Sequence, residues 1–312
     1  MIKVLVVGYG SIGSRHARIL TDMGYSVSVV SSRVVEFPHV FKSLDAALEN
    51  QKFEYVVLAN KTVEHYETLL RLVGHEFKGL VLMEKPLFDY EYKLPEFDFS
   101  RWYVAYNLRL HPLIQRIREI ILKEKTLSVQ VYVGQYLPTW RPDSDYRISY
   151  SAKKNDGGGV LRDLSHELDY ILWLFGDWKR VSALGGKFSS LEIDSHDIFA
   201  FLLSTRLCPV VSVQMNYLDR KARREIIIIT DNHSYKIDLV NGFLWRDEVV
   251  EKIETSRDFT YILQHKAVLS ENDDNLCSLA TGNEVLRCIA AIEKSAEVER
   301  WISNEYYMYD LC

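Results

Sequence analysis

The sequence predicts a two-domain α/β protein. Its N-terminal domain is expected to have a doubly wound parallel sheet, and its second domain an open, mostly antiparallel sheet with helices. Through the first hundred residues, apolar runs alternate with segments of helical periodicity, which is typical of strand–helix–strand units. After about residue 120 the apolar runs follow one another closely, as in a sheet of antiparallel neighbours. We therefore expect domains over residues 1–120 and 121–312.

The first domain opens with residues 2–7, a continuous apolar run typical of a strand that is buried on both faces. A glycine-rich turn and a helical segment follow it. The elements expected next are strands over residues 27–30, 55–59, 80–83 and 102–106, and helices near 44–48 and 64–73. Strands that alternate with helices form a parallel sheet covered on both faces.

The second domain begins with residues 127–137, whose alternation predicts a half-buried strand. A long polar segment, residues 138–159, leads into one strong helix over residues 160–175. The elements expected after it are strands over residues 180–185, 197–203, 210–216, 225–230 and 234–239, and helices over 259–269 and 283–295. The aromatic run at residues 306–309 is expected to pack or to mediate dimerisation.

Composition argues against several classes of protein. With 47% hydrophobic and 26% charged residues the chain is ordinarily globular, and its net charge of −5 argues against a nucleic-acid partner. No apolar stretch approaches the roughly 18 residues that span a bilayer, so we expect a cytoplasmic protein without a membrane partner. No residue set has the spacing of metal ligands, and we expect no metal. The cysteines, which form no CxxC pair, are Cys208, Cys277, Cys288 and Cys312.

A glycine-rich turn directly follows the first expected strand and opens the first helix. In the GxGxxG pattern, the first glycine permits a tight turn and the second lets the backbone approach a pyrophosphate. The third lets helix and strand pack closely, with the phosphates over the helix N-terminus. The alternative is a tight turn without a ligand; the position and context favour a dinucleotide-binding Rossmann domain. Its binding residues would be Gly8, Tyr9, Gly10, Ser11, Ile12 and Gly13.

The end of the second strand predicts which dinucleotide binds. An NAD site usually places an acidic residue there to hold the ribose 2′-hydroxyl, but here no acid precedes Glu36. Ser31, Ser32 and Arg33 stand in that place instead. Hydroxyls and a guanidinium suit a 2′-phosphate, so we expect NADP to be preferred over NAD. The alternative is that Arg33 is a solvated loop residue.

The helix over residues 160–175 carries the clearest acid–base pair. Its apolar stripe is Val160, Leu164, Leu168, Ile171 and Phe175. Asp163 and His166 fall on another face, where a histidine three residues from a carboxylate is a plausible acid–base pair. The alternative is an ordinary exposed pair.

The polar segment before this helix combines aromatic rings with arginines. Aromatic faces pack on sugar rings, and arginines bind carboxylate or phosphate groups. Trp140, Arg141, Tyr146 and Arg147 are therefore substrate-binding candidates, and they suggest an anionic sugar such as a nucleotide sugar or a sugar acid. The alternative is an oligomerisation arm. A separate basic cluster near Tyr217 and Arg224 is interpreted as a solvated strand end.

Glu84-Lys85-Pro86 follows the strand expected over residues 80–83. Together with the glycine turn and the helix that Gly157-Gly158-Gly159 leads, it resembles the Gfo/Idh/MocA family of nicotinamide-dependent oxidoreductases over nearly the whole chain. The resemblance implies a Rossmann domain and an α/β domain whose open sheet often mediates homodimers or homotetramers. It also implies a small-molecule substrate of the sugar type, changed at a ring carbon.

The resemblance assigns Lys85 a catalytic and a binding role. Its ammonium would donate to the reacting oxygen and stabilise developing alkoxide charge. The peptide before Pro86 is expected to be cis. The cofactor-contacting residues implied outside the glycine turn and residues 31–33 are Ala59, Asn60, Thr62, His65, Glu84, Lys85 and Asn107, and the domain-junction segment adds Tyr106 and Asn107 as substrate-binding residues.

By the same resemblance, Asp163 and His166 would help to hold the substrate, and His166 would relay the proton, oriented by Asp163. The sequence departs from the family here, because Asp163 and His166 are three residues apart where the sugar and inositol dehydrogenase pattern has four. The departure puts the role of Asp163 in question.

Together these features favour an NADP-preferring oxidoreductase that transfers hydride to or from a hydroxyl or ketone of a sugar derivative. Two alternatives stay open. One is an NAD-dependent glycoside hydrolase that oxidises its substrate transiently, and the other is a non-catalytic nucleotide-sensing regulator of the same fold.

Overall fold

The computed structural model describes residues 1–142, 144–272 and 274–304, so the run at 306–309 lies outside the described residues. The chain forms two compact units: one holds residues 1–110 and 257–283, the other residues 111–256 and 284–312. The boundary between the units therefore lies at residues 110–111, earlier than the expected residue 120. Residues 257–283, which come late in the sequence, also belong to the first unit. They belong there because helix α7 (Phe259–Leu269) packs against α1 (Ser11–Asp22) within that unit.

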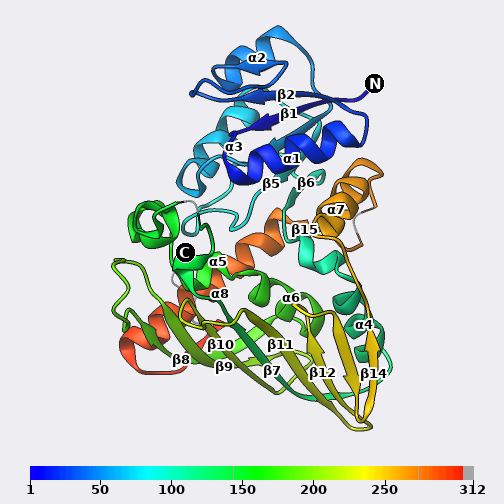
Figure 1. Cartoon of the computed structure of the whole chain (residues 1–312), viewed down its shortest axis with the longest axis vertical. Coiled ribbons are helices and arrows are strands. Elements are labelled where there is room, and N and C mark those ends of the chain that lie inside the picture. The colour runs from blue at the N-terminus through cyan, green and yellow to red at the C-terminus, as the bar shows by residue number, and fades with distance from the viewer. Residues whose placement is uncertain (143, 273, 305–312) are drawn as a thin grey trace. The chain divides into compact units, whose positions relative to one another are not determined.

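The first unit is built on a sheet with the strand order β15-β6-β5-β4-β1-β2-β3 (Figure 1). Neighbouring strands from β3 to β6 are parallel, whereas the edge strand β15 is antiparallel to β6. The expected doubly wound parallel sheet is thus confirmed. Its strands are β1 (Lys3–Val7), β2 (Ser26–Val30), β3 (Val40–Phe41), β4 (Tyr55–Leu58), β5 (Leu80–Met83), β6 (Trp102–Val104) and β15 (Cys277–Ser278).

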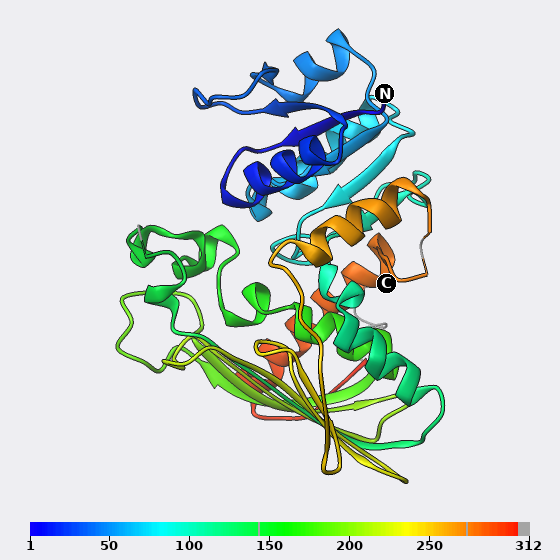
Figure 2. The same ribbon diagram turned by 45° about the vertical axis from the view of Figure 1, so that its right-hand side comes forward.

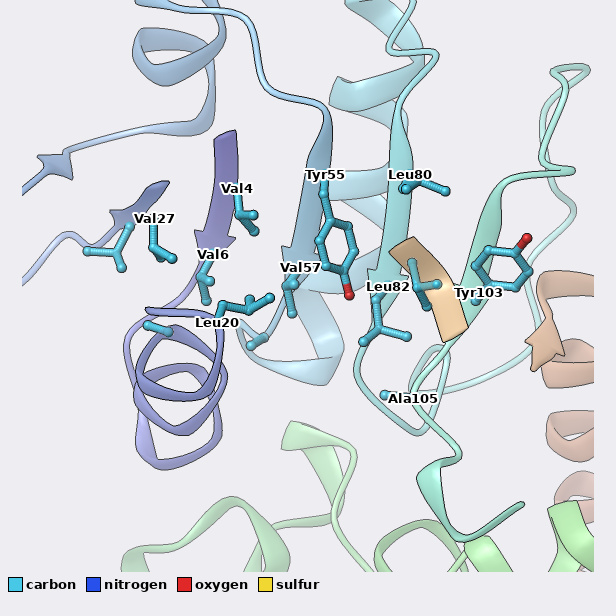
Figure 3. Close-up of a cluster of buried hydrophobic side chains, with 14 of the residues drawn as sticks. Val4, Val6, Leu20, Val27, Tyr55, Val57, Leu80, Leu82, Tyr103 and Ala105 are labelled. Atoms are coloured by element: carbon cyan, nitrogen blue, oxygen red, sulfur yellow. The ribbon is translucent and has the colours of Figure 1, made fainter. Parts of the chain in front are cut away.

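Alternate residues of these strands form one buried cluster on the side of α1 and α7 (Figure 3). Val4 and Val6 of β1 lie beside Tyr55 and Val57 of β4, and Leu20 of α1 packs against them. The intervening residues, Leu5 and Val56 among them, are fully buried too. Both faces are therefore covered. Helix α2 (Leu44–Asn50) buries Leu44 and Ala47, and helix α3 (His65–Gly74) buries Leu69 and Leu72.

The second unit contains a sheet with the order β14-β13-β12-β11-β7-β10-β9-β8-β16. All its neighbours are antiparallel except β7 and β10, which confirms the expected mostly antiparallel sheet. The strands are β7 (Thr126–Gly134), β8 (Trp178–Gly186), β9 (Ile198–Thr205), β10 (Val210–Asn216), β11 (Arg223–Thr230), β12 (Ser234–Asp238), β13 (Phe243–Arg246), β14 (Val249–Lys252) and β16 (Ile302–Ser303).

Helices of the second unit pack on one face of this sheet (Figure 2). Val181, Phe201 and Val213 point to that face and are buried. On the opposite face, Leu184 of β8 is 72% exposed and Leu202 of β9 is 49% exposed. Among the described residues this opposite face is therefore open to solvent.

The helix expected over residues 160–175 is in fact two helices, α5 (Val160–Asp163) and α6 (His166–Phe175). At the junction, the Ser165 and Glu167 amides donate to carbonyls only three residues earlier, which tightens the backbone into a 3₁₀ turn. The preceding polar segment contains short 3₁₀ turns at Leu137–Thr139, Tyr146–Ile148, Tyr150–Ala152 and Lys154–Asp156. The remaining helices are α4 (Pro112–Ile121) and α8 (Leu279–Val298), and no helix among the described residues is long and apolar enough to cross a membrane.

Candidate functional site

The candidate cofactor residues gather at one edge of the first unit's sheet. Because β1, β2, β4, β5 and β6 are parallel, their carboxyl ends meet at that edge. The glycine turn follows β1, residues 31–33 follow β2 and residue 59 follows β4. Residues 84–85 follow β5, and 105–107 follow β6. In open parallel sheets ligands bind at this edge, where the strand order reverses between β1 and β4.

Each glycine of the GxGxxG turn meets a different physical requirement. Gly8 has a φ of +93°, and a Cβ there would lie 2.6 Å from the Ala59 carbonyl oxygen. A Cβ on Gly13 would lie 2.0 Å from the carbonyl oxygen of Gly8, so helix α1 can approach β1 only without a side chain. A Cβ on Gly10, in contrast, would have no atom within 4 Å. The second glycine thus borders open space, as the close approach of a phosphate requires.

Helix α1 begins beside that open space. Its N-cap, Gly10, supplies no side-chain hydrogen bond, and its first turn carries no acidic residue. The first amides of a helix have no partner within the helix, and their partial positive charge favours an anion. Gly8, Gly10, Ser11, Ile12 and Gly13 therefore fit the pyrophosphate of a dinucleotide.

The residues after β2 are linked to the glycine turn through Arg33. Arg33 donates from Nη2 to the Tyr9 carbonyl oxygen at 3.0 Å, and the Ser31 hydroxyl donates to the Arg33 carbonyl oxygen at 3.2 Å. Ser32 and Arg33 are exposed. A second cation, Lys42, lies with Nζ 3.5 Å from the Arg33 carbonyl oxygen. Sequence reasoning missed Lys42 because it follows β3, a strand of only two residues.

Hydrogen bonds join the turn after β4 to its surroundings. Asn60 donates from Nδ2 to the Thr68 hydroxyl at 2.9 Å, and Thr62 begins a short 3₁₀ turn. His65 is buried, with Nδ1 3.0 Å from the Leu87 carbonyl oxygen and Nε2 3.3 Å from that of Asn60. Burial lowers the pKa of His65, which keeps the ring neutral with a single N–H. His65 therefore links the turns after β4 and β5.

The Glu84-Lys85-Pro86 segment leaves β5 through a cis peptide between Lys85 and Pro86, as the resemblance implies. Glu84 is buried, and its carboxylate contacts His16 Nε2 at 2.8 Å and the backbone N–H of Lys85 at 3.2 Å. Lys85 is half-buried. The structure thus places a lysine at the carboxyl edge of the sheet, two strands away from the glycine turn.

Tyr106 and Asn107 follow β6 and are buried in the first unit. Asn107 donates from Nδ2 to the Thr260 hydroxyl at 2.8 Å. This bond joins the strand end to α7, so Asn107 has a structural partner from a segment far along the chain.

In the second unit, Asp163 is a buried carboxylate between two tyrosines. Its Oδ2 accepts a hydrogen bond from the Tyr217 hydroxyl, and the Tyr150 hydroxyl also hydrogen-bonds to it. Burial, followed by the charge of Asp163, raises the pKa of both phenols well above the usual value. Both tyrosines therefore remain protonated and donate to Asp163. Sequence reasoning treated Tyr217 as part of a solvated strand end and did not assign Tyr150 a role at the site.

Trp140 belongs to the same group. Its ring packs edge-on against Tyr217, with centroids 5.3 Å apart, and the Arg141 guanidinium lies 5.7 Å from the Tyr150 ring centroid. The indole Nε1 of Trp140 is buried and has no hydrogen-bond partner among the described residues. An N–H in this situation is suited to donate to a ligand oxygen.

The side chains of Tyr146 and Arg147 both contact Glu192. Arg147 is exposed and forms ion pairs with Asp145 at 2.7 Å and Glu192 at 3.1 Å. The Tyr146 hydroxyl accepts a hydrogen bond from the Glu192 backbone N–H at 3.3 Å. Their partners thus differ from those of Trp140, and the positive charge of Arg147 is already neutralised.

His166 is half-buried and begins α6, so the break after Asp163 separates the two residues onto different helices. The next residue, Glu167, is fully buried, with Oε1 2.7 Å from Nε of Arg224. The interpretation of Arg224 as solvated is therefore wrong, because β11 directs it against α6.

Helix α5 is held in place by an ion pair with α8. Arg162 donates from Nη1 and Nη2 to the two carboxylate oxygens of Glu293, at 2.5 and 3.1 Å, and His196 Nδ1 lies 3.6 Å away. Burial raises the pKa of Glu293, but His196 and Arg162 together outweigh burial and lower it to about 2. The charged carboxylate thus stabilises the fold above the ordinary pKa of about 4.5.

This ion pair predicts acid sensitivity. Because the folded-state pKa is depressed, its contribution of about 3 kcal/mol is present above pH 4.5 and is lost as the pH falls towards 2. We expect Glu293→Gln to lower the urea-unfolding free energy by about 3 kcal/mol at pH 7 and by less than half of that at pH 3. Glu297→Gln, at an exposed position on the same helix, is the control. A deficit independent of pH would contradict the assignment.

No group of three or more histidine, cysteine or acidic side chains in the described part of the chain has the geometry of a metal site.

The family model described as "GFO/IDH/MocA C-terminal domain" matches residues 114–236. A search of curated proteins finds no match. Solved structures similar to this chain include levoglucosan dehydrogenase in complex with NADH, with a TM-score of 0.83 and 17% identity over 97% of this chain and 98% of that one.

Two further similar structures bind nucleotides. WlbA dehydrogenase from Bordetella pertussis, in complex with NADH and UDP-GlcNAcA, has a TM-score of 0.76 and 18% identity over 97% of this chain and 98% of that one. GenD2 from gentamicin A biosynthesis, in complex with NAD, has a TM-score of 0.77 and 19% identity over 97% of this chain and 96% of that one. These identities establish the fold alone, and the match to the GFO/IDH/MocA C-terminal domain model is confined to residues 114–236 of the second unit.

Proposed function

We propose that this protein is a nicotinamide-dependent oxidoreductase that transfers hydride between its cofactor and a ring hydroxyl or ketone of a sugar derivative. The observation that carries the proposal is the shared edge of the first unit's sheet. There a phosphate-binding glycine turn after β1 and a lysine after β5 stand on one parallel scaffold. The similar structures with NADH or NAD support a nicotinamide cofactor.

The residues present fit a dinucleotide. The open space at Gly10 and the uncapped start of α1 suit the pyrophosphate, and Asn60 and Lys85 end the neighbouring strands. When bound, the nicotinamide supplies or accepts the hydride.

We further propose a preference for NADP. Arg33 and Lys42 present two cations at the end of β2, and Ser31 and Ser32 supply hydroxyls. A 2′-phosphate would gain charge-assisted hydrogen bonds there. Because no acidic residue ends β2, a free ribose 2′-hydroxyl lacks its usual carboxylate partner.

Lys85 is proposed as the hydrogen-bond donor to the reacting oxygen of the substrate. Its ammonium donates to the carbinol or carbonyl oxygen and stabilises the negative charge that develops there. His166 is proposed as the proton relay, since imidazole exchanges protons near neutral pH. Asp163 accepts hydrogen bonds from Tyr217 and Tyr150, which hold its carboxylate in a fixed orientation.

The substrate class follows from the group around Asp163. Trp140 offers an indole N–H and a ring face, and Arg141 adds a cation, which together suit a sugar that carries an anionic group. A nucleotide sugar or a sugar acid is the finer proposal. Leu184 and Leu202, exposed on the open sheet face, favour homodimers or homotetramers built through that sheet.

The cofactor proposal is tested by titrating the protein with NADPH and NADH while following nicotinamide fluorescence. We expect tighter binding of NADPH, and a roughly ten- to hundredfold rise in its Kd in Arg33→Ala and in Lys42→Ala. The Kd for NADH should change less than about twofold. Arg71→Ala, which removes an exposed arginine of α3, is the matched control.

Equal or tighter binding of NADH would overturn the NADP preference, and failure to bind either cofactor would overturn the oxidoreductase. With the better cofactor, a panel of neutral sugars, sugar acids and nucleotide sugars then identifies the substrate by the change in nicotinamide absorbance. Net hydrolysis of a glycoside without net cofactor turnover would contradict this proposal. It would identify the protein as a glycoside hydrolase that oxidises its substrate transiently.

A further inference from the structure

Four buried side chains in the first unit form a single hydrogen-bonded series, and each comes from a different part of the fold. Glu84 follows β5, His16 lies in α1, His265 lies in α7 and Tyr55 begins β4. Glu84 Oε1 lies 2.8 Å from His16 Nε2, and His16 Nδ1 lies 2.9 Å from His265 Nε2. His265 Nδ1 lies 2.9 Å from the Tyr55 hydroxyl, which projects from the buried sheet face shown in Figure 3.

The direction of these bonds follows from the end of the series. Tyr55 and His265 are fully buried. Burial raises the pKa of Tyr55 well above its usual value, so the hydroxyl keeps its proton. Among the described residues its one hydrogen-bond partner is His265 Nδ1. A buried hydroxyl that failed to donate would lose a hydrogen bond, so Tyr55 donates and His265 Nδ1 accepts.

The remaining protons are then fixed in turn. Burial lowers the pKa of His265 well below its usual value, which leaves that ring neutral with one proton. The proton must be on Nε2, which donates to His16 Nδ1. The proton of His16 must therefore be on Nε2, which donates to Glu84. All donors point towards Glu84, and the carboxylate completes the series.

Other titratable groups around the series leave this order intact. Tyr261 of α7 packs edge-on against the His16 ring at 5.6 Å, and Arg15 lies over Tyr261 and pairs with Asp258 at 2.6 Å. His65 of α3 interacts electrostatically with Glu84 but stays neutral because it is buried. Among the described residues, the Glu84 carboxylate is thus hydrogen-bonded by His16 on Oε1 and by the backbone N–H of Lys85 on Oε2.

We propose that Tyr55, His265 and His16 form a positioning relay for Lys85. The relay holds the Glu84 carboxylate against the backbone N–H of the lysine and ties that strand end to α1, the helix that begins at the glycine turn. It thereby keeps the lysine and the phosphate-binding turn in one geometry, which is the kind of preorganisation that catalysis rewards. This inference rests on the proposed role of Lys85.

Two substitutions of His16 test separately its hydrogen bonds to Glu84 and to His265. The amide nitrogen of glutamine reaches about as far as Nε2, so His16→Gln can still donate to Glu84. The shorter asparagine places its amide near Nδ1, so His16→Asn keeps a partner for His265 and loses Glu84. A merely space-filling histidine would tolerate the two changes about equally. The relay predicts the larger loss with asparagine, which breaks the bond to Glu84, and a smaller loss with glutamine, which breaks only the bond to His265. Exposed His75, which pairs with Asp45, provides the control His75→Gln.

The test combines nuclear magnetic resonance with kinetics. In protein labelled with ¹⁵N-histidine, we expect both His16 and His265 to carry their proton on Nε2. The backbone amide resonance of Lys85 should shift in His16→Asn but stay near its wild-type position in His16→Gln. With the best sugar of the panel, kcat should fall about ten- to a hundredfold in His16→Asn and less than about threefold in His16→Gln and His75→Gln.

A proton on Nδ1 of either histidine, or a Lys85 amide that responds equally to both His16 substitutions, would overturn the relay. Equal kcat values for the two variants would overturn its role in positioning. The resonance measurements need neither cofactor nor substrate. If no cofactor bound while the tautomers were as expected, the proposed function would fail and the relay would stand.

Discussion

Replacing Lys85 by methionine is expected to lower kcat for hydride transfer by about 10²–10³-fold, the usual cost of removing one donor to a developing oxyanion. Methionine keeps the length and most of the apolar stem of lysine but has no ammonium. The dissociation constant of the cofactor should change less than about fivefold, because the glycine turn and the start of α1 supply most of the binding groups.

The measurement is a stopped-flow record of nicotinamide absorbance with the best sugar of the panel. Lys52→Met is the matched control, since Lys52 is exposed and precedes β4 at the opposite edge of the sheet. A kcat for Lys85→Met within threefold of wild type would contradict the assignment. A large loss of cofactor affinity instead would make Lys85 a binding residue.

Substitutions in the glycine turn are expected to have the second large effect. Two of them distinguish an effect on folding stability from an effect on cofactor binding. In Gly13→Ala the new Cβ would lie 2.0 Å from the Gly8 carbonyl oxygen, so α1 must move away from β1. We expect a loss of several kcal/mol in stability and of cofactor binding with it. In Gly10→Ala the new Cβ enters open space, so stability should change by less than about 1 kcal/mol while the cofactor Kd rises at least tenfold.

Thermal unfolding without cofactor and fluorescence titration of NADPH measure the two effects. A Gly10→Ala protein that binds the cofactor normally would place the phosphates elsewhere. A Gly13→Ala protein as stable as wild type would show that α1 can shift at little cost.

Local sequence signals predicted the first unit's sheet because its strands are short, continuous apolar runs that end in glycine or polar turns. The same parallel arrangement brings those turns to one edge, so the glycine turn, Ser31–Arg33 and Glu84-Lys85 could be assigned together. Lys42 escaped notice because β3 has two residues and no recognisable periodicity. The break after Asp163 escaped notice as well, because residues 160–175 keep a helical pattern while the backbone tightens for a single turn.

The partners of Asp163 and Glu84 could not be predicted for a different reason. Tyr217 is 54 residues from Asp163 along the chain, and His16 is 68 residues from Glu84. Periodicity reports which face of an element is apolar, but it does not report which distant element will pack there. Buried polar side chains need a partner, yet sequence alone offers many candidates for each.

The return of residues 257–283 to the first unit has a consequence for how the protein is made. This segment supplies α7, β15 and His265, so a chain emerging from the ribosome has synthesised the whole of residues 111–256 before the first unit can be completed. Until then the apolar face that receives Val268 and Leu276 has no cover. The first unit is therefore the first to be synthesised but can complete its folding only late. Until then, the nascent chain exposes an apolar surface that a chaperone is suited to shield.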